Sequence, residues 1–359
     1  MRRLLFALAL LPGLCAAAIH TEIGEINGAK FRIDVPEKWN GGLVIYCHGY
    51  SDKPESYENK PIPFIDIFTN QGYAFIQSGY AAGGWAIQEA VEDTEALRRY
   101  FIRKHGAPKE TYVTGHSMGG FLTMVLIESF PNAYDAGLPL CGPLGAATWF
   151  MEREPLDLRA VFDFYFPNTL PDPAKVPSGF KESKELNEQI TSLLDSKPAQ
   201  ADIVRRWCGI HTNKELAATV VFFTYVLMDL EQRGGGNPFD NRNIIYSGTP
   251  DDNALNDGVK RYAANPHATE YLRTYYTPTG RLTRPMLAIH TTYDPIVPPW
   301  VPSAYSLLTQ QMGTGNLFVQ QYVKHDGHCA INNAEVARGF AELREWKNRG
   351  TRPSGGASQ

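Results

Sequence analysis

Short apolar runs alternate with segments of helical period along most of this chain, and this alternation restricts its fold more than any other feature. Residues 87–101, for example, carry apolar side chains at helical spacing with charged residues between them. Buried strands joined by helices form a parallel sheet with both faces covered. The pattern therefore predicts an α/β fold with a mostly parallel central sheet flanked by helices. The expected strands cover residues 43–47, 73–77, 110–114, 136–140, 286–290 and 317–323.

A long interruption separates the fourth expected strand from the fifth. Residues 142–283 are rich in proline and aromatic residues, and their clearest helix covers residues 215–230. Because the strand pattern resumes afterwards, we expect a helical insertion that caps the sheet, inside one domain of residues 19–348. Two tandem domains are the alternative that the length allows.

Shorter signals complete the expected layout of the domain. Asn27-Gly28 interrupts residues 23–35 and is typical of a tight hairpin turn, because both residues accept positive φ angles. Residues 118–130 form a largely apolar helix that ends before a proline. Residues 349–359 are rich in glycine and serine, so we expect a flexible tail.

The first 18 residues have the pattern of a signal peptide. Two arginines precede an apolar stretch over residues 4–14, and three alanines follow at residues 16–18. The apolar stretch is too short to span a bilayer, so we expect cleavage after Ala18 and no stable membrane span. The protein is then secreted or periplasmic. A lipid-modified Cys15 and a buried first helix are the alternatives.

Charge and cysteine content narrow the functional classes. Thirty-four Lys and Arg against 38 Asp and Glu give a net charge of −4 with no basic block, which argues against nucleic acid as a partner. Export permits disulfides. Four cysteines remain after the expected cleavage, and both one bridge and free buried thiols stay open, with the pairing undetermined. They are Cys47, Cys141, Cys208 and Cys329.

The strongest chemical signal is the G-x-S-x-G segment Gly115-His116-Ser117-Met118-Gly119, which lies directly between an expected strand and an expected helix. A sharp strand-to-helix turn lifts a serine hydroxyl out of the backbone, and glycines leave room for that turn. The helix N-terminus adds unpaired N–H groups where an oxyanion would form. The segment therefore predicts a nucleophilic serine at Ser117.

A serine nucleophile needs a base and an acid, and both follow at the ends of later strands. Asp294 lies in the segment D-P-I-V-P after the fifth strand, and His328 lies in G-H-C after the sixth. Open α/β sheets gather their sites at the carboxyl ends of strands. His325 competes with His328 as the base, but we favour His328 because it follows Gly327. Three further acids lie in a polar loop of the insertion and are interpreted as turn formers: Asp251, Asp252 and Asp257.

These three motifs together resemble an α/β-hydrolase-fold serine hydrolase, of the secreted carboxylesterase type. The resemblance covers residues 20–142 and 284–348, and residues 142–283 occupy the position where that fold carries its lid. It implies a catalytic triad in which Ser117 is the nucleophile, His328 the base and Asp294 the acid that orients the imidazole. It also implies an oxyanion hole formed by the backbone N–H groups of Tyr50 and Met118. No cofactor is implied.

Two histidine interpretations accompany this assignment. His48 is expected to brace the loop that carries Tyr50 rather than to react. A zinc site built from His325, His328 and Cys329 has ligating atoms but lacks a fourth ligand at suitable spacing, so we expect no metal.

The leading hypothesis is a secreted hydrolase that forms an acyl-enzyme on Ser117 and cleaves a small-molecule or polymer-borne carboxylic ester. The aromatic residues of the insertion form its own core, line an apolar pocket, or do both, which would suit an aryl or hydrophobic acyl group such as hydroxycinnamoyl. The alternatives are an exported serine aminopeptidase of the same fold, with Glu182, Glu185 or Glu188 binding the substrate amine, and a non-catalytic binding protein on the same scaffold.

Overall fold

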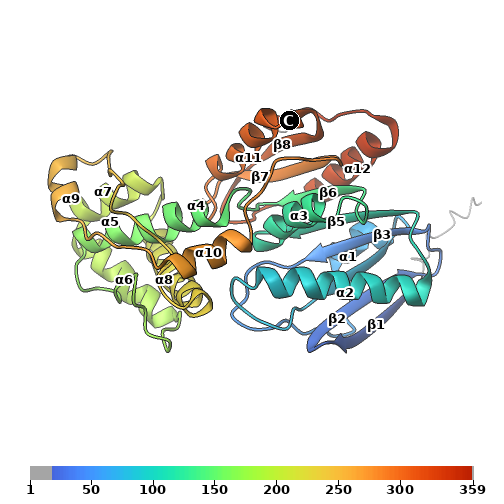
Figure 1. Ribbon diagram of the computed structural model, residues 1–359, viewed down its shortest axis with the longest axis horizontal. Helices are drawn as coiled ribbons and strands as arrows, with labels where there is room; N and C mark the ends of the chain where they lie inside the picture. The colour runs from blue at the N-terminus through green and yellow to red at the C-terminus, as the bar shows by residue number, and fades with distance from the viewer. Residues whose placement is uncertain (1–17, 358–359) are drawn as a thin grey trace, which may run out of the picture.

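A single nine-stranded sheet runs through the structure, a computed structural model that describes residues 18–357 (Figure 1). The strand order is β1-β2-β4-β3-β5-β6-β7-β8-β9. The first 17 residues of the expected signal peptide lie outside the described residues. The strands are β1 (Ile19–Ile26), β2 (Ala29–Pro36), β3 (Gly42–Cys47), β4 (Ala74–Ser78), β5 (Glu110–His116), β6 (Ala136–Leu140), β7 (Met286–Tyr293), β8 (Phe318–Asp326) and β9 (Gly356–Ala357).

The sheet is mostly parallel, which confirms the predicted fold class. β1 and β2 form an antiparallel hairpin, and β2 pairs antiparallel with β4. Asn27 and Gly28 make the hairpin turn with φ angles of 54° and 87°. From β4 through β3 to β9 every neighbouring pair is parallel, so the carboxyl ends of β3, β5, β7 and β8 meet at one edge.

Helices cover both faces of the sheet and divide its core in two. Leu97 of α2 and Leu122 of α3 belong to one apolar cluster, which continues into the insertion through Val220. Phe68 of α1 and Phe340 of α12 belong to the second cluster, with ring centroids 5.0 Å apart. These helices are α1 (Pro63–Thr69), α2 (Ile87–His105), α3 (Met118–Ser129) and α12 (Asn333–Arg349), and α11 (Trp300–Gln311) packs beside β8.

The segment between β6 and β7 is helical and lies to the left of the sheet in Figure 1. It is joined to the sheet domain by partly buried polar contacts as well as by apolar packing. The Asp229 carboxylate accepts the Trp85 N–H at 2.6 Å, and Glu128 of α3 accepts the Tyr276 hydroxyl at 2.8 Å. Its elements are α4 (Ala147–Met151), the π-helix η1 (Glu152–Leu156), α5 (Asp157–Tyr165), α6 (Lys184–Ser196), α7 (Pro198–Cys208), α8 (Asn213–Gly234), α9 (Asp252–Gly258) and α10 (Pro266–Thr274).

The C-terminal segment, which the sequence predicts to be a flexible tail, contains a two-residue strand. Residues 356–357 form β9 beside β8, and the Arg352 guanidinium donates to the Phe318 carbonyl oxygen at 2.7 Å. The Gln321 amide donates to the Ser354 carbonyl oxygen at 3.0 Å. The exposed edge of β8 offers unpaired backbone groups, and the tail satisfies some of them although its composition carries no strand signal. Within residues 18–357, no helix combines the length and the apolar character needed to cross a membrane.

Candidate active site

Ser117 lies on a tight turn between β5 and α3. Its backbone has φ 56° and ψ −121°, an angle pair that a non-glycine residue rarely adopts. A Cβ on Gly115 would lie 2.4 Å from the Cys47 carbonyl oxygen, and one on Gly119 would lie 1.9 Å from the same oxygen. Both glycines of the motif are therefore required by the close approach of β3, and the turn can aim the serine hydroxyl away from the sheet.

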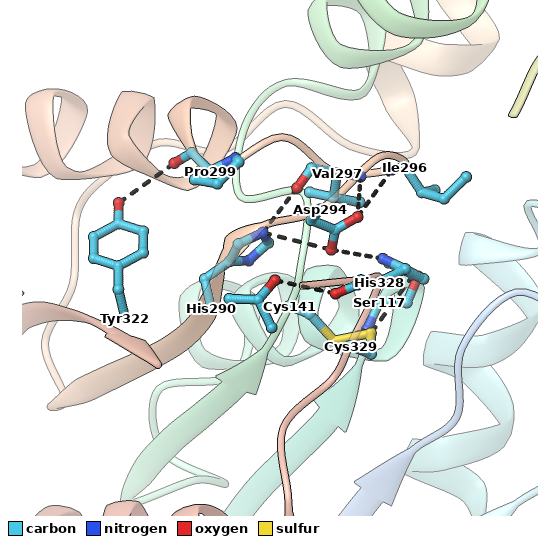
Figure 2. A network of polar contacts seen from close by, with 12 residues as sticks. Ser117, Cys141, His290, Asp294, Ile296, Val297, Pro299, Tyr322, His328 and Cys329 are labelled. Carbon is cyan, nitrogen blue, oxygen red and sulfur yellow. Dashed lines mark hydrogen bonds and ion pairs between the residues drawn. A yellow bond between two sulfur atoms is a disulfide. The ribbon is translucent and has the colours of Figure 1, made fainter. Parts of the chain in front are cut away.

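The structure brings Ser117, His328 and Asp294 together in one hydrogen-bonded chain (Figure 2). Nε2 of His328 lies 2.8 Å from the Ser117 Oγ atom, and Nδ1 of the same ring lies 2.8 Å from Oδ2 of Asp294. Because an ionised carboxylate only accepts, Nδ1 carries the hydrogen and Nε2 is left to accept the serine proton. The expected contacts among the three residues are present.

Asp294 is buried and kept ionised by its surroundings. Its Oδ1 atom accepts the N–H groups of Ile296 and Val297, each at 2.9 Å. Burial alone raises the pKa of this carboxyl, but the hydrogen bond with His328, the nearby His290 ring and the Val297 N–H together hold the pKa below its usual range. The acid therefore remains an anion beside the imidazole.

His290 is a neighbour of the acid that the sequence motifs did not identify. It lies on β7 four residues before Asp294, and its Nε2 atom donates to the Val297 carbonyl oxygen at 2.8 Å. The same nitrogen is 3.7 Å from Oδ2 of Asp294. Burial lowers the pKa of His290 although Asp294 opposes this effect. A register shift between Thr291 and Tyr293 interrupts β7 before Asp294, so the regular period of two along a strand does not predict this contact.

The competing histidine points elsewhere. Nε2 of His325 lies 2.9 Å from Oε1 of Glu335, in the first turn of α12. Gly327, with φ 117°, lies between the two histidines, and it is His328 whose ring contacts Ser117. Two of the three acids in the polar loop of the insertion have local partners, because Asp251 caps α9 and Asp252 accepts hydrogen bonds from Thr249 and Gly248.

Two backbone segments lie next to Ser117. Met118 is the first residue of α3, so its N–H has no acceptor in the helix. A Cβ on Gly49 would lie 3.4 Å from the Ser117 Cβ atom, which places the loop carrying Tyr50 against Ser117. His48 braces that loop as expected. Its Nδ1 atom donates to the Gly49 carbonyl oxygen at 2.7 Å, and its ring stacks on Tyr80 at 3.9 Å between centroids.

A small apolar pocket of about 30 Å³ opens beside Ser117. Phe150, Phe222 and Phe223 of the insertion line it, whereas Phe162 and Phe166 stack on each other inside the insertion at 5.2 Å. The aromatic residues thus divide between the two expected roles. None of the lining side chains, all within the described residues, is charged. The remaining lining residues are Tyr50, Trp85, Met118, Pro143, Met151, Val226, Ile296 and Val297.

The cysteine pairing that the sequence left open is Cys141 with Cys329. Cys47 is a buried thiol on β3 and Cys208 a partly buried thiol at the end of α7. Because the Cys329 sulfur is bonded to another sulfur, it is not a thiolate ligand. Among residues 18–357 no cluster of three or more His, Cys, Asp or Glu side chains is arranged to hold a metal ion.

The chain is similar to known proteins in its structure but not in its sequence. No family model matches the chain, and no curated protein matches its sequence. An acylaminoacyl peptidase from Pyrococcus horikoshii aligns with a TM-score of 0.50 and 12% identity, over 93% of this chain and 42% of that one. The chain has the α/β-hydrolase fold.

Two other solved structures of this fold are similar in the same way. A puromycin hydrolase aligns with a TM-score of 0.50 and 13% identity, over 96% of this chain and 41% of that one. An esterase from Pyrococcus furiosus aligns with a TM-score of 0.47 and 11% identity, over 92% of this chain and 90% of that one. This chain spans about two fifths of the length of the peptidase and of the puromycin hydrolase.

Proposed function

We propose that this protein is an exported serine hydrolase that cleaves carboxylic esters through an acyl-enzyme on Ser117. The observation that carries the proposal is the chain of two 2.8 Å contacts from Ser117 through His328 to Asp294. A nucleophile, a base in hydrogen-bond reach and an acid that orients the base are the groups that acyl transfer requires.

In the proposed reaction, His328 Nε2 takes the Ser117 proton as Oγ attacks the ester carbonyl carbon. The negative charge that develops on the carbonyl oxygen is stabilised by the backbone N–H groups of Met118 and Tyr50. Protonated His328 then gives its proton to the departing alcohol, which leaves an acyl-Ser117. Water repeats the sequence, with His328 as its base, and releases the carboxylic acid. Asp294 stays ionised throughout and stabilises the imidazolium.

The apolar pocket supports an uncharged and small acyl group. A volume of about 30 Å³ accommodates a few heavy atoms, on the scale at which ~10–15 Å³ holds one water molecule. Acetyl to butyryl groups are therefore the preferred acyl groups. A hydroxycinnamoyl group enters only if the surrounding side chains move, so we place aryl esters below short aliphatic ones.

The pocket also favours an ester over an aminoacyl substrate. An aminopeptidase needs an anionic group facing the substrate ammonium, and the three candidate carboxylates do not line the pocket beside Ser117. Glu188, for example, is paired with Lys184 on exposed α6 at 3.6 Å. Export is supported by the expected signal peptide over residues 1–18 and by the Cys141–Cys329 disulfide, since disulfides persist in oxidising compartments.

The test compares the mature protein, beginning at residue 19, with its Ser117→Ala variant. The substrates are p-nitrophenyl acetate, butyrate and octanoate, a hydroxycinnamate methyl ester, and aminoacyl- and peptidyl-p-nitroanilides. We expect acetate or butyrate to give the highest kcat/KM and the variant to lose about 10⁴-fold or more. Anilide turnover with little ester activity would replace the proposal with the peptidase. If the folded protein hydrolyses none of these substrates and a fluorophosphonate does not label Ser117, the result would support a non-catalytic binding protein.

A further inference from the structure

The Cys141–Cys329 disulfide lies against the imidazole of His328 and against the backbone of Ser117. Cys329 is the residue after His328, and its Sγ atom is 3.5 Å from Nε2 of the imidazole (Figure 2). Cys141 is the residue after β6, and its Sγ atom is 3.4 Å from the backbone nitrogen of Ser117. The bridge therefore joins the segment that carries the base to the strand end against which the nucleophile turn rests.

The Ser117 turn is independently fixed to that strand end. Its N–H donates to the Leu140 carbonyl oxygen at 2.9 Å, one residue before Cys141. Cys141 itself is fully buried. The nucleophile and one half of the bridge thus form a rigid unit of the sheet, and the other half fixes the position of His328 relative to that unit.

The segment around His328 has few other attachments to the sheet. Gly327 is bound to β7 on both sides: its N–H donates to the Tyr293 carbonyl oxygen at 3.0 Å, and its own carbonyl oxygen accepts the Thr291 hydroxyl at 3.2 Å. Beyond it, the Ala330 and Ile331 N–H groups donate to the carbonyl oxygens of Gly327 and Cys329. These last bonds are internal to the loop, so they shape it without anchoring it.

The backbone at the bridge adopts conformations that the chain does not favour by itself. Cys329 has φ 56° and Cys141 has φ 46°, both in the left-handed region that L-residues with a side chain avoid. Such conformations persist only where the surroundings impose them. A loop without the bridge is free to leave the left-handed region at residue 329, and the neighbouring imidazole moves with it.

We propose that this disulfide is a positioning element of the active site, which holds His328 Nε2 within reach of the Ser117 hydroxyl. The inference rests on the proposed hydrolase function and adds a requirement to it. A bridge across 188 residues also stabilises the fold. The positioning role is distinct, because it acts on the chemical step through His328 and leaves the apolar pocket unchanged.

The rest of the fold gives reason to expect that the protein without the bridge remains folded. Ile331 packs against the apolar cluster beneath α12, and α12 keeps its own capping box at Asn332 and Glu335. We therefore expect the loop to shift between two attached ends while the sheet and helices persist. Below the unfolding transition of the variant, a change in activity then reports on geometry.

The test measures kcat, KM and the rate of fluorophosphonate labelling of Ser117 in the mature protein and in Cys141→Ala/Cys329→Ala. All assays run at a temperature where circular dichroism shows both proteins folded. We expect kcat and the labelling rate to fall about 10- to 100-fold, with KM within about threefold, because a 1 Å misplacement of a catalytic group costs about that much. Cys208→Ala, which removes a free thiol outside the site, is the matched control and should behave as the unmodified protein.

The decisive comparison repeats the double substitution in a His328→Ala background. If the bridge acts through His328, its removal there lowers the residual rate no further, whereas a purely structural effect lowers it by the same factor. Reduction of the unmodified protein gives a second measurement. Dithiothreitol supplies two electrons and two protons, becomes a cyclic disulfide and leaves two thiols, and reoxidation by oxidised glutathione should restore the rate.

The possible results distinguish failure of the positioning role from failure of the proposed hydrolase function. Equal kcat and labelling with and without the bridge, in a protein that labels normally at Ser117, would overturn the positioning role alone. An equal factor of loss in both backgrounds would also overturn it. A folded unmodified protein that neither turns over esters nor labels at Ser117 would overturn the hydrolase proposal and this inference together.

Discussion

Asp294 presents one carboxylate oxygen to His328 and the other to the backbone. Oδ2 lies 2.8 Å from Nδ1 of His328, while Oδ1 accepts the N–H groups of Ile296 and Val297. The backbone contacts fix which oxygen faces the ring. The carboxylate therefore determines both the orientation and the tautomer of the imidazole.

An Asp294→Asn variant should lose activity through the tautomer alone. The two backbone N–H groups hold the amide oxygen at the Oδ1 position, which turns the NH₂ group toward His328 Nδ1. The ring then carries its hydrogen on Nε2 and cannot accept the Ser117 proton. We expect kcat to fall about 10⁴-fold with the fold intact, measured by ester hydrolysis and circular dichroism. A loss below tenfold would contradict the assigned role of Asp294.

Substitution of His328 and of His325 should have very different effects on ester hydrolysis. His328→Ala removes the base and should lower kcat about 10⁴-fold or more. His325→Ala removes a partly exposed partner of Glu335, so its kcat/KM should stay within about threefold, as expected for surface substitutions outside the site. The measurement is ester turnover of both variants at one pH. The reverse pattern would assign the base to His325.

Phe222→Ala should widen the acyl pocket. Phe222 lines the pocket beside Ser117 and packs edge-on against Tyr50, with ring centroids 5.5 Å apart. Removing its ring should raise the ratio of octanoate to acetate kcat/KM by about tenfold or more, the scale of one to two methylene groups in an apolar pocket. Phe164→Ala is the matched control, since this half-buried phenylalanine lies in the insertion away from the pocket. An unchanged ratio in Phe222→Ala would exclude this pocket as the acyl site.

The partly buried carboxyl of Glu154, whose pKa is affected by Asp294, should make stability depend on pH. Burial raises the pKa of Glu154 from about 4.5 in the unfolded chain to about 8, with Asp157 and Asp294 adding to the effect and Arg153 opposing it. The folded protein thus binds the proton more tightly. The contribution of Glu154 to the free energy of unfolding is therefore fully present below pH 4.5 and is lost as the pH rises to about 8.

Glu154→Gln removes that titration. Between pH 5 and pH 8, the unfolding free energy of the unmodified protein should fall by about 1–3 kcal/mol more than that of Glu154→Gln, as measured by urea denaturation. Exposed Glu188→Gln is the control and should follow the unmodified protein. Parallel pH curves for all three proteins would mean that Glu154 is ionised in the fold.

The central strands and the contacts among the candidate site residues were predictable because local signals mark them. Asn27-Gly28 marks the turn of the first hairpin. The glycines on either side of Ser117 mark a tight turn, because the close approach of the neighbouring backbone leaves no room for a side chain there. Asp294 and His328 follow apolar runs, and carboxyl ends of parallel strands meet at one edge. Each of these inferences depends on residues close together in the sequence.

The features that sequence analysis missed depend on contacts between distant residues. Cys141 and Cys329 are 188 residues apart, and nothing in their local sequence distinguishes them from Cys47 and Cys208. The strand β9 is held by backbone pairing to β8, and the glycine- and serine-rich sequence of the tail does not predict a strand. The order β2-β4-β3 likewise depends on which strands pair in the folded sheet, and the apolar runs in the sequence do not indicate their pairing partners.

The position of His328 along the chain has a consequence for biosynthesis. The base lies 211 residues after the nucleophile, on the far side of the helical insertion. A ribosome builds the chain from its N-terminus, so β1 to β7 and Ser117 are complete before the imidazole exists. A serine without its base is a poor nucleophile. In the proposed mechanism, a nascent or prematurely terminated chain that stops short of residue 328 thus lacks the base for Ser117, and we expect it to hydrolyse esters about 10⁴-fold more slowly than the protein that contains His328.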